Sequence, residues 1–379
     1  MTTPDAQRTG SRFTQFLRSV FSNLQDLFTQ GVTRQGLRDL VQRDARDTFR
    51  FFTSEIDFAE LRPLPWYKRY PRLVWRIFVA LAYRMSPPRR IAFLVATVAF
   101  IQGWYRFTVL DGSGTGWWLI AIAIFVILLL MELRDKLDLK GDLEIACEIQ
   151  VGLAPSQPFS QDGITIHCQM RPANTVGGDY HDIVSLGESR IGVVVGDVSG
   201  KGMPAALLAA LLQGSLRTLI TAGLRGSELI TKLNQYLCAS TPANSLVTLF
   251  YAELDTTAGD LRFVNAGHNA PFLVRSNQTL ERLGSTSLVL GFLKETIFEM
   301  KNARLDPGDR LLIFTDGVTE AFNAGEKEYG EERLSEILRK HKASLQNVLI
   351  QEIIADVLNF CDSEKPGDDM TLMVIGRPL

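Results

Sequence analysis

Two stretches of the chain consist of apolar residues without a single Lys, Arg, Asp or Glu. One covers residues 91–105 and the other residues 117–131, with a Gly-rich turn between them. Both stretches are apolar on every side, which is typical of helices that face lipid, whereas surface helices carry one apolar stripe. Tryptophan and tyrosine flank the turn, as at a membrane interface. The pattern predicts a two-helix transmembrane hairpin over residues 91–131; the alternative is a buried hairpin in a soluble domain.

Basic residues flank the outer ends of this hairpin. They are Arg84, Arg89 and Arg90 before it, and Arg134, Lys136 and Lys140 after it. Because Lys and Arg accumulate on the cytoplasmic side of a membrane, both ends are expected in the cytoplasm. Residues 1–30 contain no apolar segment of the signal-peptide kind. We therefore expect a protein of the cytoplasmic membrane, with its N-terminus and its C-terminal part both cytoplasmic.

Residues 1–90 read as a basic, amphipathic helical segment. Apolar residues recur every three or four positions over residues 13–28, and a second helical stretch over residues 37–52 is rich in Arg. Basic amphipathic helices beside a membrane span can lie on its anionic inner leaflet. The alternative, a small helical bundle or a helix that packs on a partner, remains open from the sequence.

Residues 132–155 predict a linker helix. Leu133, Leu137 and Ile149 belong to an apolar stripe of nearly heptad spacing, and the helix should end near Leu153 because two prolines follow. Two copies of the chain could pair through this stripe, so a homodimer is expected.

Residues 156–379 combine short strands with long helices. Strands are predicted at residues 164–170, 191–195, 246–255, 261–264, 310–314 and 370–375, and helices at residues 203–222, 227–240, 331–342 and 345–361. Runs of strands alternate with groups of helices, which favours an α+β fold in which helices cover β-sheets.

Composition excludes several classes of protein. Residues 1–90 contain 16 Lys and Arg against 8 Asp and Glu, so their charge of +8 leaves −10 for the rest of a chain whose net charge is −2. The chain as a whole is therefore not basic, as a nucleic-acid-binding protein would be, and no nucleic-acid partner is expected. The four cysteines lie far apart without a C-x-x-C pair, which excludes a zinc cluster or a disulfide framework of the usual kind.

Four short motifs place Asp beside Gly in the C-terminal part. They are GGDYHD with Asp179, GDVSG with Asp197, TDG with Asp316, and GDDMT with Asp368 and Asp369. Apolar strands lead directly into Asp197 and Asp316, which places these carboxylates on rigid supports. Carboxylates without Cys, and with a single His in the motifs, are typical of a Mg²⁺ or Mn²⁺ site, whereas zinc is disfavoured. A lone Asp-Gly pair is usually a turn, so only the set indicates a site.

From about Leu143 onward the chain resembles the protein phosphatase 2C-like (PPM) metallophosphatases, in particular their bacterial stage II sporulation protein E and RsbU branch. The resemblance rests on DLEIACEIQVGLAP, RPANTVGGDYHD, GDVSGKGMPAALLAA, VTLFYAELD, NAGHNAP, LLIFTDGVTEA and GDDMTL, which occur in the family's order. It implies a central antiparallel β-sandwich flanked by helices (α-β-β-α), here preceded by a helical membrane region.

The resemblance also implies roles for individual residues. Asp197 would bridge two divalent cations, Mn²⁺ or Mg²⁺, and Asp179 would reach the first cation directly or through waters. The remaining implied ligands are the Val198 carbonyl, Asp316 and Asp368, with Asp182 and Asp369 as weaker candidates. Two such cations activate a water and neutralise phosphoryl charge, so no covalent phosphoenzyme is needed. Asp179 and Asp197 are therefore the expected catalytic residues.

Other positions depart from the family's pattern or stay open. His181 stands where the family usually has an aromatic residue, and we expect it to pack. His268 is expected to support its loop, and Arg171 is either a phosphate contact or a surface charge. Where some members have DGHGG this chain has DVSGK, so the leaving-group acid is unidentified, and Lys201 is open as a contact to substrate or to the metal site. The GDVSGKG stretch is not a nucleotide-binding P-loop, because only three residues separate its first two glycines.

The sequence thus predicts a membrane-anchored, metal-dependent protein serine/threonine phosphatase. By resemblance its substrate is a phosphorylated regulatory protein such as an anti-sigma-factor antagonist. The alternative is a catalytically inactive membrane scaffold of the same fold that binds a phosphorylated partner. The four aspartates that the motifs retain argue against this alternative.

Overall fold

The computed structural model describes residues 65–110, 114–155, 157–242, 245–341, 344–362 and 366–378. The predicted helices at residues 13–28 and 37–52 lie outside these ranges. The chain divides into two compact units, Met1–Asp135 and Lys136–Leu379. Each unit is described by itself.

The first unit is helical over its described part. It contains α4 (Trp66–Arg84), α5 (Pro87–Tyr105), the π-helical turn η2 (Arg106–Leu110) and the beginning of α6 (Thr115–Leu153). Aromatic rings join these helices, since Phe93 of α5 lies 5.0 Å from Phe78 and 5.9 Å from Phe125 between ring centroids. The second apolar stretch and the predicted linker form one continuous helix, which ends at Leu153.

The second unit contains two antiparallel sheets. One has the strand order β1-β2-β11-β10-β7-β8 and the other β3-β4-β5-β6-β9. The bounds of the first sheet's strands are β1 (Phe159–Gln161), β2 (Ile164–Arg171), β7 (Phe272–Val274), β8 (Leu280–Arg282), β10 (Arg310–Phe314) and β11 (Met370–Gly376). Those of the second are β3 (Tyr180–Gly187), β4 (Arg190–Val198), β5 (Val247–Asp255), β6 (Asp260–Ala266) and β9 (Lys301–Arg304).

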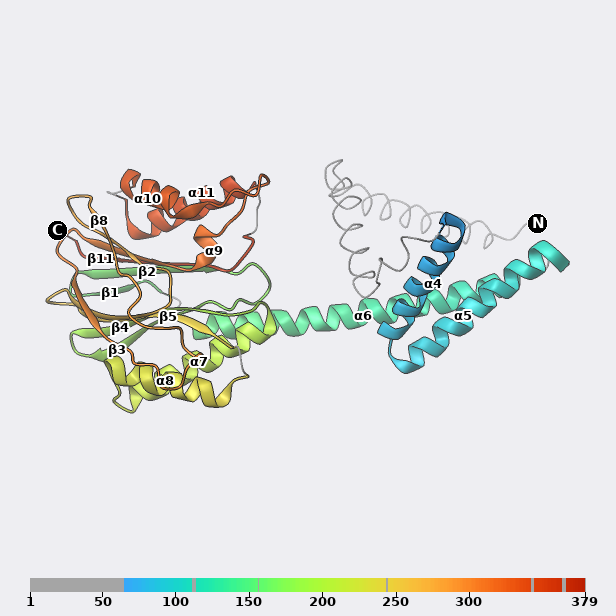
Figure 1. Cartoon of the computed structure of the whole chain (residues 1–379), viewed down its shortest axis with the longest axis horizontal. Helices are drawn as coiled ribbons and strands as arrows, with labels where there is room; N and C mark the ends of the chain where they lie inside the picture. Colours follow the sequence, from blue (N-terminus) through green and yellow to red (C-terminus); the bar gives the residue numbers. More distant parts are fainter. Residues whose placement is uncertain are drawn as a thin grey trace, which may run out of the picture. The chain divides into compact units, whose positions relative to one another are not determined.

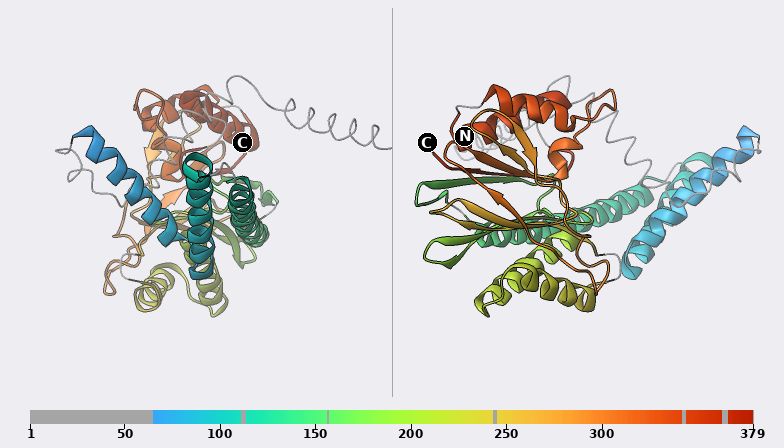
Figure 2. Two further views of the ribbon diagram at one scale, coloured as in Figure 1. Left: turned by 90° about the vertical axis from the view of Figure 1, so that its right-hand side faces the viewer. Right: turned by 60° about the vertical axis from the view of Figure 1, so that its left-hand side comes forward.

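Helices cover the outer face of each sheet, as Figures 1 and 2 show. The helices α7 (Met203–Thr221) and α8 (Gly226–Ser240) lie on the five-stranded sheet, and α10 (Gly330–Lys340) and α11 (Gln346–Cys361) on the six-stranded sheet. The short helix α9 (Asp316–Thr319) follows β10. This α-β-β-α arrangement confirms the predicted fold class.

Three apolar cores explain the layers. The central core fills the space between the sheets and contains Ile166, Val193, Phe250, Ile313 and Met373, all buried. Strands that bury both faces read as continuous apolar runs, which is why IGVVVG and LLIF are so hydrophobic. The outer cores lie beneath the two helix pairs. Both sheets are therefore rigid supports for whatever their ends carry.

Candidate active site

The first two acidic motifs meet at one end of the five-stranded sheet. Asp197 is the last residue but one of β4, and Asp179 immediately precedes β3. The two strands are antiparallel, and Tyr180 pairs with Gly196. The end of β4 therefore lies beside the beginning of β3, which brings Asp179 and Asp197 together across 18 residues of sequence.

The other two motifs meet in the same way in the six-stranded sheet. Phe314 of β10 pairs with Leu372 of β11. Asp316 follows β10, whereas Asp368 and Asp369 precede β11, so the antiparallel pairing places them side by side.

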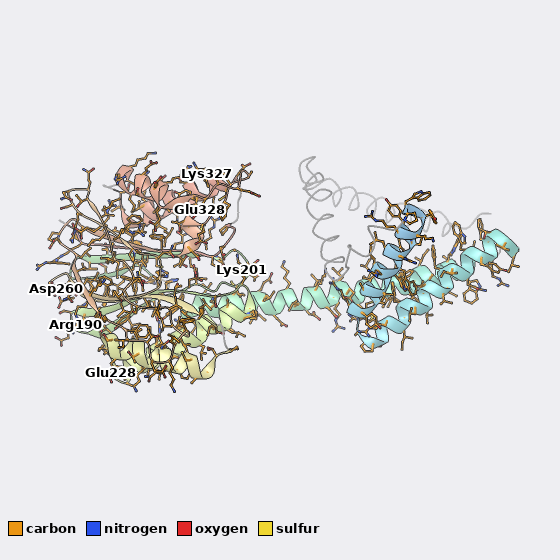
Figure 3. The ribbon with its side chains drawn as sticks, in the orientation of Figure 1. Arg190, Lys201, Glu228, Asp260, Lys327 and Glu328 are labelled. Carbon is orange, nitrogen blue, oxygen red and sulfur yellow. The ribbon has the colours of Figure 1, made fainter. Side chains whose placement is uncertain are left out.

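Hydrogen bonds connect the two sheets at this end. The Thr315 hydroxyl donates to the Asp179 carboxylate (2.8 Å). Asp369 accepts the backbone N–H of Gly178 (2.6 Å) at one oxygen and that of Ala173 (2.8 Å) at the other. In Figure 3 this end of the sandwich is marked by Lys201, and the opposite end by Arg190 and Asp260.

Two glycines allow the backbone to approach closely here. A Cβ at Gly178 would lie 3.1 Å from the Val198 carbonyl oxygen and 3.0 Å from the Ala205 Cβ. A Cβ at Gly317 would collide with the backbone oxygen of Asp369. The Asp-Gly pairs of the sequence are therefore required by packing around the carboxylates as well as by turns.

The carboxylates of this cluster interact electrostatically. Burial, followed by the charges of Asp316 and Asp368, raises the pKa of Asp197 to about 7. Burial also raises the pKa of Asp179 well above its usual range, with a further contribution from Asp197. The pKa of Asp316 is raised by burial and then by Asp368. Several negative carboxylates gathered in a partly buried site repel one another, so the site favours binding of a cation.

The donor chemistry fits divalent cations such as Mg²⁺ or Mn²⁺. Four carboxylates and the Val198 carbonyl offer only hard oxygen ligands. Within the described ranges no three His, Cys, Asp or Glu side chains already converge on one point at metal-binding distance. The charges of these carboxylates nevertheless raise one another's pKa, so they share one electrostatic environment.

The weaker candidate Asp182 belongs to a different environment. Its side chain is 0% exposed, and the Arg217 guanidinium of α7 binds both carboxylate oxygens at 2.7 and 2.8 Å. The Tyr180 hydroxyl also donates to it (2.9 Å). Asp182 therefore joins β3 to the helix layer, and its oxygens already have partners.

The two histidines singled out in the sequence are buried. Burial lowers the pKa of His181 to about 4, and within the described residues its Nδ1 has no hydrogen-bond partner. His268 lies 3.0 Å from the Thr248 hydroxyl through Nδ1, and its backbone N–H donates to Asn265. Thr248 pairs with Asp197 in the sheet. His268 thus supports the NAGHNAP loop beside the cluster, as expected.

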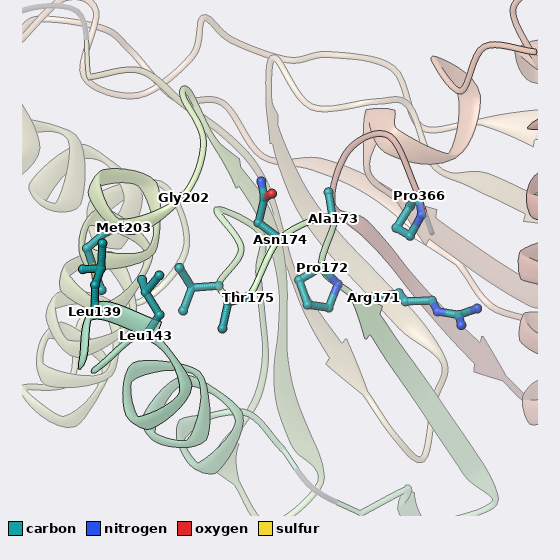
Figure 4. Close-up of a pocket in the computed structure, with 11 residues that line it drawn as sticks. Leu139, Leu143, Arg171, Pro172, Ala173, Asn174, Thr175, Gly202, Met203 and Pro366 are labelled. Atoms are coloured by element: carbon teal, nitrogen blue, oxygen red, sulfur yellow. The ribbon is translucent and has the colours of Figure 1, made fainter. Parts of the chain in front are cut away.

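A pocket of about 890 Å³ is lined by residues that stand close in sequence to the acidic motifs, among them Val176 and Pro366. Figure 4 shows Leu139 and Leu143 of α6 on one side, Arg171 and Pro366 on the other, and the residues between β2 and β3 connecting them. Gly202, which follows Lys201, also lines it.

Three contributing residues were missed from the sequence. Glu320 adds to the charge that raises the pKa of Asp197. Thr315 connects the sheets, and its place directly before Asp316 was an available signal. Gln150 of α6 exchanges two hydrogen bonds with Gly177, donating at 2.7 Å and accepting at 3.2 Å. It lies in the DLEIACEIQVGLAP stretch that carries the resemblance, but its own contact was not predicted.

Comparison with known proteins agrees with this geometry. The chain is 28% identical to the phosphoserine phosphatase RsbU of Bacillus subtilis, over 63% of this chain and 71% of RsbU. It is 27% identical to the protein IcfG of Synechocystis, over 66% of this chain but only 43% of IcfG. The SiaA-PP2C domain of Pseudomonas aeruginosa has the same fold, with a TM-score of 0.56, 18% identity, and coverage of 64% of this chain and 98% of that domain.

The sequence pattern of the stage II sporulation protein E (SpoIIE) family matches residues 187–378. These residues form most of the sandwich and contain the motifs of Asp197, Asp316 and Asp368. The chain therefore belongs to the SpoIIE family and carries a PP2C-type serine phosphatase domain.

Proposed function

We propose that this chain is a membrane-anchored, metal-dependent protein serine/threonine phosphatase that acts on a phosphorylated regulatory protein. The observation that carries the proposal is the gathering of Asp179, Asp197, Asp316 and Asp368 at one end of the sandwich, from four separate motifs. A fold kept only for binding would have no need of coupled, partly buried carboxylates.

In this proposal the four aspartates and the Val198 carbonyl would hold two cations, Mn²⁺ or Mg²⁺. When bound, such a pair supplies an activated water and positive charge for the phosphoryl oxygens. The chain's own residues fix the geometry: Thr315 orients the Asp179 carboxylate, and Asp369 fixes the loop that carries Gly178. Because β4 and β10 are buried, the carboxylates at their ends are placed before substrate binds.

Removal of one central carboxylate tests the activity. Asp197→Asn is expected to lower kcat on a phosphoserine peptide at least about 100-fold, because a ligand shared by both cations is lost. EDTA should abolish the activity of the detergent-solubilised chain, and added Mn²⁺ should restore it. Asp260→Asn, at the opposite end of the sandwich, is the matched control and should behave as wild type. Activity that persists in EDTA or in Asp197→Asn contradicts the two-metal proposal.

Membrane anchoring is supported by the helices of the first unit. By length and composition, α5 with η2 and α6 could each cross a membrane. Their buried positions are Phe93, Leu128 and the small residues Ala96, Ala99, Gly103 and Ala121, whereas most of their larger apolar side chains are exposed. Small residues at helix contacts are typical of membrane proteins. Alkaline carbonate washing of bacterial membranes should leave the chain in the pellet, and its release into the supernatant contradicts the proposal.

A regulatory role of α6 is supported by its contact with the site. Gln150 binds Gly177, two residues before Asp179, and Gln213 of α7 donates to the Leu153 carbonyl at the end of α6 (2.8 Å). A homodimer formed through the apolar stripe of α6 could move this contact. Gln150→Ala should therefore change kcat without unfolding the domain, and light scattering of the solubilised chain should give a dimer mass. An unchanged kcat in Gln150→Ala together with a monomer mass would contradict regulation through α6.

The proposed substrate class follows from the relatives. RsbU is named a phosphoserine phosphatase, and by family resemblance we propose an anti-sigma-factor antagonist as substrate. The inactive scaffold of the same fold is the second candidate. It would bind a phosphorylated partner with equal affinity in wild type and in Asp197→Asn, and would release no phosphate with either metal.

A further inference from the structure

Lys201 occupies the tip of the loop between β4 and α7. The glycines on both sides adopt backbone conformations that other residues rarely adopt, with φ of +104° at Gly200 and +71° at Gly202. The base of the loop is fixed, since the Ser199 N–H donates to the Leu246 carbonyl (2.9 Å) and its hydroxyl accepts the Leu246 N–H (3.0 Å). The loop therefore presents Lys201 from a defined position at the end of the sandwich (Figure 3).

The Lys201 ammonium contacts one of the proposed metal ligands. Its Nζ lies 2.5 Å from Oδ2 of Asp368. The other oxygen of that carboxylate, Oδ1, accepts the backbone N–H of Asp369 (2.9 Å). Both oxygens of Asp368 are thus engaged, and the ammonium competes with a metal ion for the negative charge at Oδ2.

Lys201 can move at little cost. Its side chain is 58% exposed and that of Asp368 is 45% exposed, so the ion pair lies largely in water. Ion pairs this exposed stabilise a fold weakly, and a doubly charged ion held by several carboxylates attracts Asp368 more strongly than a single ammonium does. The charge of Lys201 also acts on Asp316 and partly offsets the rise of its pKa.

We propose that Lys201 is a displaceable internal cation that competes with a divalent cation for Asp368 and thereby sets the metal affinity of the site. The inference rests on the proposed function, because it takes Asp368 as a ligand. Displacement frees the Lys201 ammonium. Its neighbour Gly202 lines the 890 Å³ pocket, and there a phosphoryl oxygen of a substrate can accept a hydrogen bond from the ammonium.

Calorimetric titration of Mn²⁺ into the solubilised full chain tests the competition without any measurement of turnover. Lys201→Met should bind Mn²⁺ about tenfold more tightly than wild type, because one nearby positive charge and one competitor for Asp368 are removed. Lys201→Arg keeps the charge and should bind as wild type. Lys301→Met removes an exposed lysine from the edge strand β9 and should leave the affinity unchanged. Added NaCl should reduce the difference between Lys201→Met and wild type.

Each outcome decides between competition and a purely structural ion pair. A structural pair predicts that Lys201→Met lowers the melting temperature and binds Mn²⁺ no more tightly than wild type, and that result overturns the inference. Lys201→Gln serves as a second neutral variant, and it must show the same tightening for the inference to stand. If wild type binds Mn²⁺ but neither neutral variant binds more tightly, only the inference fails. If wild type binds no Mn²⁺, the proposed metal site fails as well.

Discussion

Helices α5 and α7 are both apolar and of equal length, yet they distribute their residues in opposite ways. α5 buries Phe93 and the small residues Ala96, Ala99 and Gly103. Its larger residues Ile91, Leu94, Val95, Val98, Phe100 and Ile101 are exposed. α7 buries Leu212, Leu216 and Ile220 against the five-stranded sheet, together with the small residues Ala205, Ala206 and Ala209. Apart from Leu207, its exposed residues are mainly small or polar, such as Ala210, Gly214, Arg217 and Thr218.

Average hydrophobicity cannot distinguish these two helices. α7 also satisfies the length and composition of a membrane span, although it belongs to the outer core of the sandwich. What separates them is the side on which most of the large apolar residues lie: α7 buries most of them against the sheet, whereas α5 exposes most of them. Water drives large apolar side chains inward, whereas a lipid environment lets them face outward and favours small residues at helix contacts.

The largest expected effect comes from placing a charge on each kind of helix. Leu212 is 0% exposed and Leu129 of α6 is 68% exposed. Leu212→Asp should prevent the phosphatase domain from folding, because a carboxylate would be buried without a partner. Leu129→Asp should leave the domain folded and active but weaken membrane insertion by about 3 kcal/mol. Limited proteolysis and membrane fractionation of both variants measure the two effects.

Equal protease resistance of the domain in Leu212→Asp and wild type would show that α7 is not part of a water-excluding core. Conversely, loss of the folded domain in Leu129→Asp would show that the outer face of α6 has a protein partner rather than lipid. Leu129→Ala is the control for size, and it should fractionate as wild type does.

A pH effect that comes from histidine is expected in the sandwich. All four histidines lie within residues 156–379, and burial lowers the pKa of His268 to about 4. Between pH 6.5 and about 4, His268 is protonated in the unfolded chain but stays neutral in the folded chain. The unfolding free energy therefore falls as the pH falls. The contribution is at most about 3 kcal/mol. Urea unfolding of wild type and His268→Asn between pH 7 and pH 4 should give curves that converge toward acid, and parallel curves contradict the assignment.

A smaller difference is expected between ion pairs of the two regions. Arg217 binds the fully buried Asp182, whereas Arg89 of α5 binds Glu132 (3.0 Å) and Asp135 (2.7 Å) of α6, which are about half exposed. Arg217→Met should lower the unfolding free energy of the domain by about 2 kcal/mol, because the buried Asp182 carboxylate loses its charged hydrogen-bond donor. Arg89→Met should lower the unfolding free energy much less, because its partners are largely solvated. Thermal unfolding of both variants measures the two losses of stability. An equal loss would contradict the expected difference between the buried and the exposed ion pair.

The sequence predicted the elements whose side-chain pattern carries its own signal. The strand at residues 310–314 coincides with β10, and the helix at residues 203–222 with α7. The strands β1, β3, β7, β8 and β9 were missed. β3 begins with Tyr180, His181 and Asp182, and three of the others have only three residues, so none shows an apolar alternation. These strands are fixed by pairing with neighbours that are distant in sequence.

The candidate site divides in the same way. The four Asp-Gly motifs and the buried strands before Asp197 and Asp316 were readable, because local turn chemistry and hydrophobicity mark them. The Asp182–Arg217 pair and the contacts of Gln150 and Lys201 depend on side chains brought together from separate elements. No spacing in the chain indicates such contacts.

The order of residues by itself determined the apolar helices, the linker that ends at Leu153, the buried strands and the supply of carboxylates. Only the tertiary structure decided which apolar helix belongs to a protein core, because that depends on whether a sheet is present to cover its large side chains. It also decided which carboxylates share one environment. Antiparallel pairing places the end of one strand beside the beginning of another, so Asp179 and Asp197, or Asp316 and Asp368, become neighbours through geometry that the linear chain does not contain.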